Sequence, residues 1–312
     1  MVLFICGCDD SANSIKYTPQ EQAEIQRYLS RVKADLVYVH GGTFWMGDFC
    51  KKMRGDGPYC SSEKDTKPLH EIELNSFSIS KFKVTHEDYK FYLKINDLPA
   101  QTFDKKWKDA TLAEMNHFKN SPAIVNWTEA NNYCIWLGRV TGLPFSLPTE
   151  AQWEYSARSR GQYILVATDD GVWRENKKNG KGINYATDVD RQAVEDKVGI
   201  NSTSVHFPVN AYPPSPLGLY GMADNGYEWV KDWYDPNYYN VADKKNPQGP
   251  EKPVIKDEQT GQYRKVLRGG NNPDPSGDVG LTFYRGYRIT DNPYPVSTTV
   301  RCVVNAPDPI KG

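Results

Sequence analysis

A stretch of more than fifty residues, 161–216, shows no sustained helical or strand periodicity, and it limits the possible folds more than any other feature of the chain. The periodic segments before and after it are short, and glycine, proline or polar residues bound them. A helical bundle needs long amphipathic segments, so this pattern excludes one. It favours a domain in which irregular structure connects short helices and strands.

The residues available for a core are rich in aromatic side chains. Hydrophobic residues make up only 38% of the 312-residue chain, but it holds 20 Tyr and 8 Trp, together with 24 Gly and 21 Pro. Aromatic side chains bury large areas and still offer a hydroxyl or ring N–H to nearby loops. A chain of this length can also bury a large core. We therefore expect an α+β domain that is irregular and loop-rich, with few helices and short antiparallel sheets.

Charge and hydropathy exclude two classes of protein. Lysine and arginine are scattered and the net charge is −1, so the sequence has no basic stripe for nucleic acid. No apolar run reaches the length of about 18 residues that a transmembrane helix requires. We expect no nucleic-acid partner, and contact with a membrane only through an N-terminal lipid anchor.

The first residues of the chain suggest such an anchor. Residues 1–10 combine an apolar run, a small residue, Cys8 and a polar tail, which resembles the end of a bacterial lipoprotein signal. The basic part and the apolar core are shorter than in a complete signal, and a frayed terminus is the alternative. We expect a truncated signal and linker over residues 1–16, lipidation at Cys8, and a location in the periplasm or on a membrane of a Gram-negative bacterium.

Local signals predict the helices and strands. A capping box at Thr18 with Pro19 at the first helical position begins an N-terminal helical extension over residues 17–36. Apolar residues at helical or alternating spacing define the remaining elements. The predicted elements are helices over residues 19–35, 86–93, 129–141 and 150–159, a strand–turn–strand unit over 36–47 and a hairpin over 71–84.

Two cysteines lie close enough in sequence to form a local disulfide. Cys50 and Cys60 flank a short polar loop, and export would take the protein to a compartment where disulfides persist. Two free surface thiols are the alternative. None of the six cysteines belongs to a CxxC motif, so a zinc ribbon or a thioredoxin-like site has no support.

Several blocks of sequence follow one another in an order that resembles a known family. They are GGTFWMGD, FSISKFKVTHEDYKFYL, SPAIVNWTEANNYCIWLG, LPTEAQWEYSARSRG, PLGLYGMADNGYEWVKDWY, VLRGG and VRC. Together they resemble the formylglycine-generating enzyme family, also called sulfatase-modifying factors. The resemblance implies a single α+β domain over residues 37–306, related to C-type lectins. It also implies a disulfide between Cys134 and Cys302.

The resemblance further implies a copper centre, which the sequence does not support. Active family members bind Cu(I) through two cysteines that follow the RGG turn, and they use O2 to convert a substrate cysteine to formylglycine. The corresponding positions fall near Asp274 and near residues 279–280, and no cysteine occurs in residues 271–301. Cu(I) requires soft thiolate ligands. We expect a member without the copper-binding cysteines, and therefore no copper and no catalytic residues.

Charged residues stand where the copper centre would lie. Asp274, Asp278, Arg285 and Arg288 fall in or beside this degenerate pocket. Paired carboxylates can perform acid–base chemistry. Acidic residues in loops are more often solvated, however, and spacing alone puts no two of these side chains within reach of one another. We expect them to mark a pocket without catalytic activity.

A structural calcium ion is also implied by the resemblance. The family holds Ca2+ at a GNxWEW turn through main-chain carbonyls and the glutamate. The corresponding turn here covers residues 224–229, with Asn225, Gly226 and Glu228 as candidate ligands. Calcium accepts mixed carbonyl and carboxylate oxygens; bracing of the turn by hydrogen bonds is the alternative. A second calcium position near residues 185–188 matches less well, because Thr187 replaces an asparagine.

Two functions remain open. The first is a non-catalytic envelope lipoprotein that binds or scaffolds a partner, such as another envelope protein, a secreted protein or a toxin that it neutralises. Its tyrosine- and tryptophan-rich loops suit binding, because such residues dominate interface hot spots. The second is a periplasmic oxidoreductase or tailoring enzyme with altered chemistry, as in siderophore maturation, which the resemblance suggests. The sequence does not specify the oligomeric state.

Overall fold

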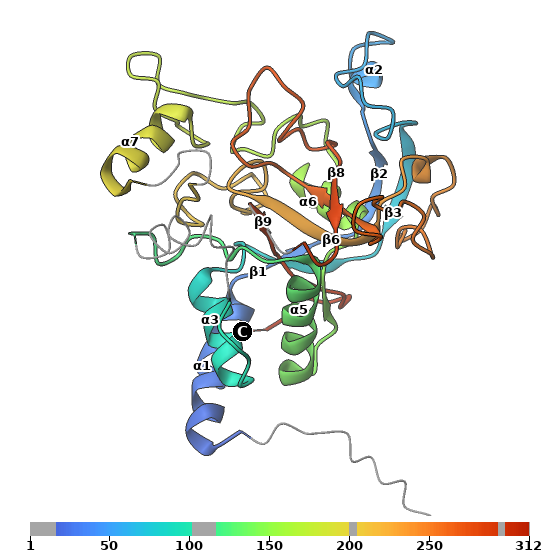
Figure 1. Cartoon of the computed structure of the whole chain (residues 1–312). Helices are drawn as coiled ribbons and strands as arrows, with labels where there is room; N and C mark the ends of the chain where they lie inside the picture. Colours follow the sequence, from blue (N-terminus) through green and yellow to red (C-terminus); the bar gives the residue numbers. More distant parts are fainter. Residues whose placement is uncertain (1–16, 102–116, 200–204, 293–296, 312) are drawn as a thin grey trace, which may run out of the picture.

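The structure, a computed structural model, describes residues 17–101, 117–199, 205–292 and 297–311. The predictions for residues 1–16, including lipidation at Cys8, lie outside the described residues. The helices, shown in Figure 1, are α1 (Pro19–Ala34), α2 (Cys50–Met53), α3 (His86–Ile95), α5 (Trp127–Thr141), α6 (Glu150–Ala157), α7 (Asp188–Val198) and the 3-10 helix η2 (Tyr238–Asn240). The strands are β1 (Leu36–Val39), β2 (Gly42–Met46), β3 (His70–Leu74), β4 (Phe77–Ser80), β5 (Phe145–Ser146), β6 (Tyr227–Trp233), β7 (Arg264–Arg268), β8 (Gly286–Ile289), β9 (Thr298–Thr299) and β10 (Val303–Val304).

These elements confirm the predicted fold class, an α+β domain with short sheets. One four-stranded sheet has the order β1-β4-β10-β5, a second has the order β8-β7-β6-β9, and β2 and β3 form a two-stranded sheet. All strand pairs are antiparallel except β6 and β9. None of the described helices is long and apolar enough to cross a membrane.

The first four strands pair differently from the prediction. β1 pairs with β4 and β2 pairs with β3, and both pairs are antiparallel. The register is the same in both, with Leu36 opposite Ser80 in the first pair and Gly42 opposite Leu74 in the second. The predicted turn within 36–47 and the predicted hairpin over 71–84 are therefore wrong. Gly41 lies at the break between β1 and β2, where a Cβ would lie only 2.3 Å from the carbonyl oxygen of Leu74. Close approach of backbones, rather than a hairpin turn, requires the glycine there.

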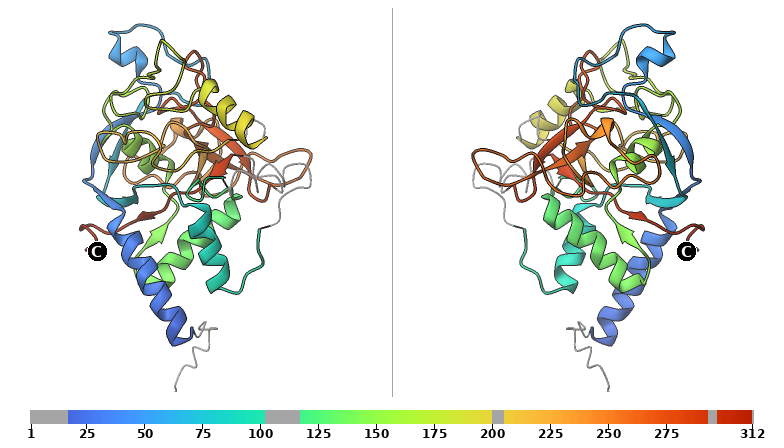
Figure 2. Two further views of the ribbon diagram at one scale, coloured as in Figure 1. Left: turned by 90° about the vertical axis from the view of Figure 1, so that its left-hand side faces the viewer. Right: turned by 90° about the vertical axis from the view of Figure 1, so that its right-hand side faces the viewer.

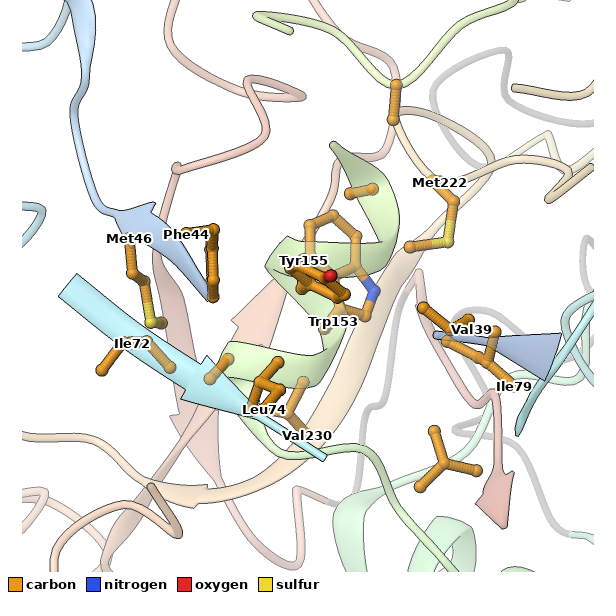
Figure 3. Packing of buried hydrophobic residues seen from close by; sticks show 14 of the residues in the cluster. Val39, Phe44, Met46, Ile72, Leu74, Ile79, Trp153, Tyr155, Met222 and Val230 are labelled. Atoms are coloured by element: carbon orange, nitrogen blue, oxygen red, sulfur yellow. The ribbon is translucent and has the colours of Figure 1, made fainter. Parts of the chain in front are cut away.

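The central core surrounds helix α6. Figure 3 shows Trp153 and Tyr155 of this helix between side chains of β2 and β3 on one side and of β1 and β4 on the other. Trp153 is fully buried. The helix is buried around its whole circumference, with all eight of its residues buried. Its charged residues are therefore buried as well, and this determines the chemistry of the site.

Three helices form a second core at one end of the molecule. Figures 1 and 2 show α1, α3 and α5 below the sheets. Tyr28 of α1 contacts Tyr133 of α5 through their hydroxyls, and Arg31 of α1 forms an ion pair with Asp88 of α3. The N-terminal helix is thus packed on the domain by apolar and charged contacts.

Helix termini follow the local sequence signals closely. Capping boxes begin α1 at Thr18, α3 at Thr85 and α6 at Thr149, as their sequences indicate. Asn126 caps α5 in the same way, and Gly142 ends it in the left-handed conformation. Helix α7 was not predicted, because it lies in the aperiodic stretch 161–216. Its capping box at Thr187 was the available signal.

Candidate functional site

The two aspartates predicted to lie in a degenerate pocket make separate local contacts. Asp274 is exposed, and its carboxylate accepts hydrogen bonds from the backbone N–H and the hydroxyl of Ser276. These two hydrogen bonds lower the pKa of Asp274. Asp278 instead accepts a 2.6 Å hydrogen bond from Ser61 Oγ, in the loop that follows α2. The two carboxylates share no partner and do not form an acid–base pair.

The two arginines of the predicted pocket differ in burial. Arg288 is half-buried in β8. Arg285 is buried and donates from Nε and Nη2 to the carboxylate of Glu150 at 2.7 and 3.0 Å. Its Nη1 donates to the main-chain carbonyls of Asp65 and Asp235 at 2.9 and 3.2 Å. Arg285 therefore pairs with Glu150 and not with Asp274 or Asp278.

Arg285 belongs to a buried cluster of ions that the sequence did not predict. Arg268 of β7 donates to Glu150 and to Glu154, both at 2.8 Å, and Arg158 donates to Glu154 at 2.8 Å. All five side chains are at most 1% exposed. Three guanidinium groups thus share two carboxylates in the interior, and each carboxylate accepts hydrogen bonds from two arginines. This arrangement fixes α6 to β7 and to the chain that precedes β8.

The lowered pKa of Glu150 indicates that its carboxylate is ionised in this cluster. Burial alone would raise the pKa of Glu150, but the charges of Arg285 and Arg268 outweigh burial and hold its pKa below the ordinary value. The sequence contained one signal for this cluster, the spacing of four residues between Glu150, Glu154 and Arg158 in a predicted helix. Such spacing is more typical of an exposed face, so the buried partner arginines could not be inferred from it.

The backbone is closely packed at the predicted position of the second copper ligand. A Cβ at Gly280 would lie 2.8 Å from the indole ring of Trp173, and one at Gly270 would lie 3.0 Å from the carbonyl oxygen of Ala223. At Gly269, φ is +75° and a Cβ would lie 2.7 Å from the carbonyl oxygen of Met222. The backbone at residues 269, 270 and 280 therefore lies directly against the 222–223 segment.

The four cysteines in the described residues are all oxidised. Cys50 is bonded to Cys60 and Cys134 is bonded to Cys302, so both predicted disulfides are confirmed. Sequence separations of 10 and 168 residues show that one bond closes a local loop and the other joins distant parts of the chain. No free thiol is present in the part of the chain that the structure describes. A Cu(I) ion, which requires thiolates, does not fit these residues.

The candidate calcium ligands have other partners. The side chain of Asn225 is bonded to the backbone N–H and carbonyl of Phe207 at 2.8 and 2.9 Å. The carbonyl oxygen of Gly226 accepts a hydrogen bond from Lys83 Nζ. The same ammonium lies 3.2 Å from Glu228, which is fully buried. The oxygens of Gly226 and Glu228 that were proposed for calcium are thus already in contact with a protein cation.

Two clefts outside the predicted pocket have the size of binding sites. One, of about 420 Å³, lies where the end of α1 meets α3 and the chain that precedes α3. The other, of about 590 Å³, carries many side-chain amides. Its lining includes Asn75, Gln152, Asn246, Gln248 and Asn305. Side-chain amides both donate and accept hydrogen bonds, so this cleft can recognise neutral polar groups.

Comparison with known proteins gives matches over most of the chain. A family model described as a sulfatase-modifying factor enzyme 1-like domain matches residues 21–294. The formylglycine-generating enzyme of Mus musculus is 30% identical over 337 residues, covering 87% of this chain and 83% of the mouse protein. A Chlamydia caviae protein named serine/threonine-protein kinase pkn1 is 28% identical over 298 residues, covering 91% of this chain. The chain spans only 39% of the length of that chlamydial relative.

A solved structure shares the fold. PvdO from Pseudomonas aeruginosa superimposes with a TM-score of 0.60 and 20% sequence identity, covering 87% of this chain and 94% of PvdO. The similarity in architecture extends over nearly the whole of both chains.

Proposed function

We propose, from the premise that the chain belongs to the sulfatase-modifying factor enzyme 1-like family, that it is a non-catalytic member that binds a partner protein. One observation carries the proposal. Residues 271–301 contain no cysteine, and the four cysteines in the described residues are consumed in two disulfides. The copper chemistry that the resemblance implies requires a pair of thiolates, and the chain offers none at the corresponding positions.

The contacts around these positions support a structural role for the residues that remain. Arg285 neutralises Glu150 in the interior, where neither group is accessible to a substrate. Asp278 is engaged by Ser61, and the backbone at Gly280 is packed against Trp173. A hydrolytic or redox centre would need accessible groups that converge on one point. The charged residues here stabilise the fold instead.

The amide-lined cleft supports binding as the activity of the domain. Asn246 Oδ1 accepts a 2.8 Å hydrogen bond from the backbone N–H of Asn75, and Lys231 Nζ donates to Gln248 Oε1 at 3.0 Å. Side chains held in this way present their remaining donors and acceptors in fixed directions, which reduces the entropy lost on binding. We assign this cleft to another envelope or secreted protein that presents main-chain amides and carbonyls.

Location at the cell envelope is part of the proposal. Cys8 lies where a lipoprotein signal would place the lipidated cysteine. Cells grown with a fatty-acid analogue should label the wild-type protein and fail to label a Cys8→Ser variant. Equal labelling of the two proteins, or labelling of neither, would contradict lipid anchoring at this residue.

The central test is catalytic. The purified protein is incubated with a peptide of the CxPxR pattern, Cu(I), a thiol reductant and O2, with the mouse formylglycine-generating enzyme as the positive control. Mass spectrometry should show the peptide cysteine unchanged by this protein and converted by the control. Conversion of the peptide, or tightly bound copper or iron in the purified protein, would contradict the proposal and favour the alternative of a tailoring enzyme with altered chemistry.

Binding at the cleft is tested by site-specific crosslinking in cells. A photoreactive amino acid at Gln248, which is exposed at the cleft, should capture a single protein partner. The same amino acid at Lys178, an exposed residue of a loop that does not line the cleft, is the matched control. If both positions capture the same partner with equal yield, or if neither position captures a partner, the interaction does not lie at this cleft.

A further inference from the structure

The turn that contains the candidate calcium ligands is held by a buried lysine. Lys83 lies between β4 and α3, and its side chain is only 1% exposed. Its Nζ donates to the main-chain carbonyl of Gly226 and lies 3.2 Å from Glu228 Oε1. A main-chain carbonyl and a carboxylate are the kind of hard oxygen ligands that Ca2+ takes. The ammonium therefore lies among the oxygens that were proposed for the metal.

Glu228 has no free charge to offer a metal ion. Arg301 donates to both of its carboxylate oxygens, at 2.9 and 3.0 Å, and Trp153 Nε1 donates to Oε2 at 3.0 Å. Burial alone would raise the pKa of Glu228, but Arg301 and Lys83 outweigh burial and lower it. One carboxylate already faces two cations. A divalent ion added at this point would meet two like charges in a buried setting, where screening by water is weak.

The chain around Lys83 holds the ammonium in place. The next residue, Val84, donates from its backbone N–H to the carbonyl of Val300 at 2.9 Å and accepts from the backbone N–H of Ala123 at 2.8 Å. Lysine is normally flexible, but here both its backbone and its head group are fixed. The position of the cation is thus determined by the fold.

We infer that the ammonium of Lys83 occupies the place of a calcium ion at the 224–228 turn, so that a covalently attached cation holds this turn without metal. The consequence is that the fold does not depend on the free calcium concentration. The inference goes beyond the proposed binding function and is independent of it.

At the second expected calcium position, a protein cation again lies in the region where the resemblance places the metal. Arg191 of α7 donates from Nη1 to the main-chain carbonyl of Val205 at 2.7 Å and from Nη2 to Asp224 Oδ1 at 2.8 Å. The side chain of Arg191 is 1% exposed. Asp224 Oδ2 accepts from the backbone N–H of Ala186 at 2.9 Å. A fixed guanidinium again bridges a carbonyl and a carboxylate, in the region where the resemblance places a metal.

The test compares two variants of Lys83. Lys83→Ala removes the ammonium and opens space beside the oxygens of Gly226 and Glu228. Lys83→Met removes the same charge but fills the space with an apolar chain of similar length. The wild-type melting temperature should be the same in calcium and in chelator. Calcium near 100 times its dissociation constant should raise the melting temperature of Lys83→Ala by roughly 5 °C. Lys83→Met should not respond.

A second readout reports on the ion directly. Tb3+ binds oxygen ligands like Ca2+ and emits when a nearby tryptophan is excited, and Trp153 is hydrogen-bonded to Glu228. Emission is expected from Lys83→Ala alone. A wild-type protein that retains calcium or melts lower in chelator would overturn the inference, as would a folded Lys83→Ala variant that responds to neither ion. If Lys83→Ala folds only with calcium, and not with magnesium, the inference is supported; failure of calcium to rescue its folding would overturn it.

Discussion

The two ends of residues 265–303 are held far more tightly than residues 271–278, here called the middle. At the first end, Arg268 is fully buried and pairs with Glu150 at 2.8 Å. At the second end, Arg301 is fully buried and pairs with Glu228 at 2.9 Å. The next residue, Cys302, carries the long-range disulfide. Each end therefore connects distant parts of the chain through a buried charge or a covalent bond.

The middle, residues 271–278, makes weaker contacts. Asp274 is exposed and bonds only within its own turn, while Asp278 has a single hydrogen bond to Ser61. The difference teaches that the ends and the middle contribute unequally to the fold. An exposed side chain such as that of Asp274 can be replaced at small cost in stability, whereas the buried ion pairs at the ends cannot.

The largest effect is expected from the disulfide at the second end. Its sequence separation is 168 residues, so removing it by Cys134→Ser with Cys302→Ser should lower the free energy of unfolding by about 5 kcal/mol. The pair Cys50→Ser with Cys60→Ser opens a loop with a separation of only 10 residues and should cost about 3 kcal/mol. Guanidinium denaturation measures both. A larger loss for the short loop would contradict the comparison.

Removing the buried carboxylate at the first end should have nearly as large an effect. Glu150→Ala leaves the guanidinium groups of Arg268 and Arg285 buried with less counter-charge, and breaking a buried pair in this way costs about 3–5 kcal/mol. Asp274→Ala, in the exposed middle, should change stability far less than Glu150→Ala does. Both values come from urea denaturation at neutral pH. Similar losses for the two variants would show that the middle is held as firmly as the ends.

A pH dependence should arise beside the same cluster. Asp232 Oδ2 accepts a 2.8 Å hydrogen bond from the backbone N–H of Glu150, and burial, together with the charge of Glu150, raises the pKa of Asp232 to about 7. The unfolded value is 3.8, so between these two values the folded protein holds a proton that the unfolded chain has lost. The contribution of Asp232 to stability therefore decreases as the pH rises through this window.

Asp232→Asn tests this directly, because asparagine keeps the acceptor but cannot ionise. Denaturation from about pH 4 to pH 7 should show a smaller fall in the free energy of unfolding for Asp232→Asn than for the wild type. The carboxylate of Glu150 gives the opposite sign: its lowered pKa contributes stability above the unfolded pKa, which is lost as the pH falls through the folded pKa. An unchanged profile in the variant would contradict the raised pKa of Asp232.

The local parts of the structure could be predicted from the sequence, and the long-range parts could not. Capping boxes at Thr18 and Thr149 act within one helical turn, so the sequence alone indicates where α1 and α6 begin. The partner strands of β1 and β2, and the arginines that neutralise Glu150, lie far away in the chain. The contact of Lys83 with residues 226–228 could not be predicted either, because nothing in the sequence around Lys83 indicates it. Burial decides which charges pair, and local patterns do not report burial.

A small effect is expected at the hydrogen bond between Ser61 and Asp278, which attaches the middle to the loop that follows α2. Ser61→Ala removes the donor to Asp278 and should cost about 1 kcal/mol, the usual value for one hydrogen bond. A double-mutant cycle with Asp278→Ala isolates this contact, because each single variant also changes other neighbours. A coupling free energy near 1 kcal/mol is expected from denaturation of the four proteins. A coupling of about 3 kcal/mol or more would equal that of a buried ion pair, and the middle would then be part of the rigid framework.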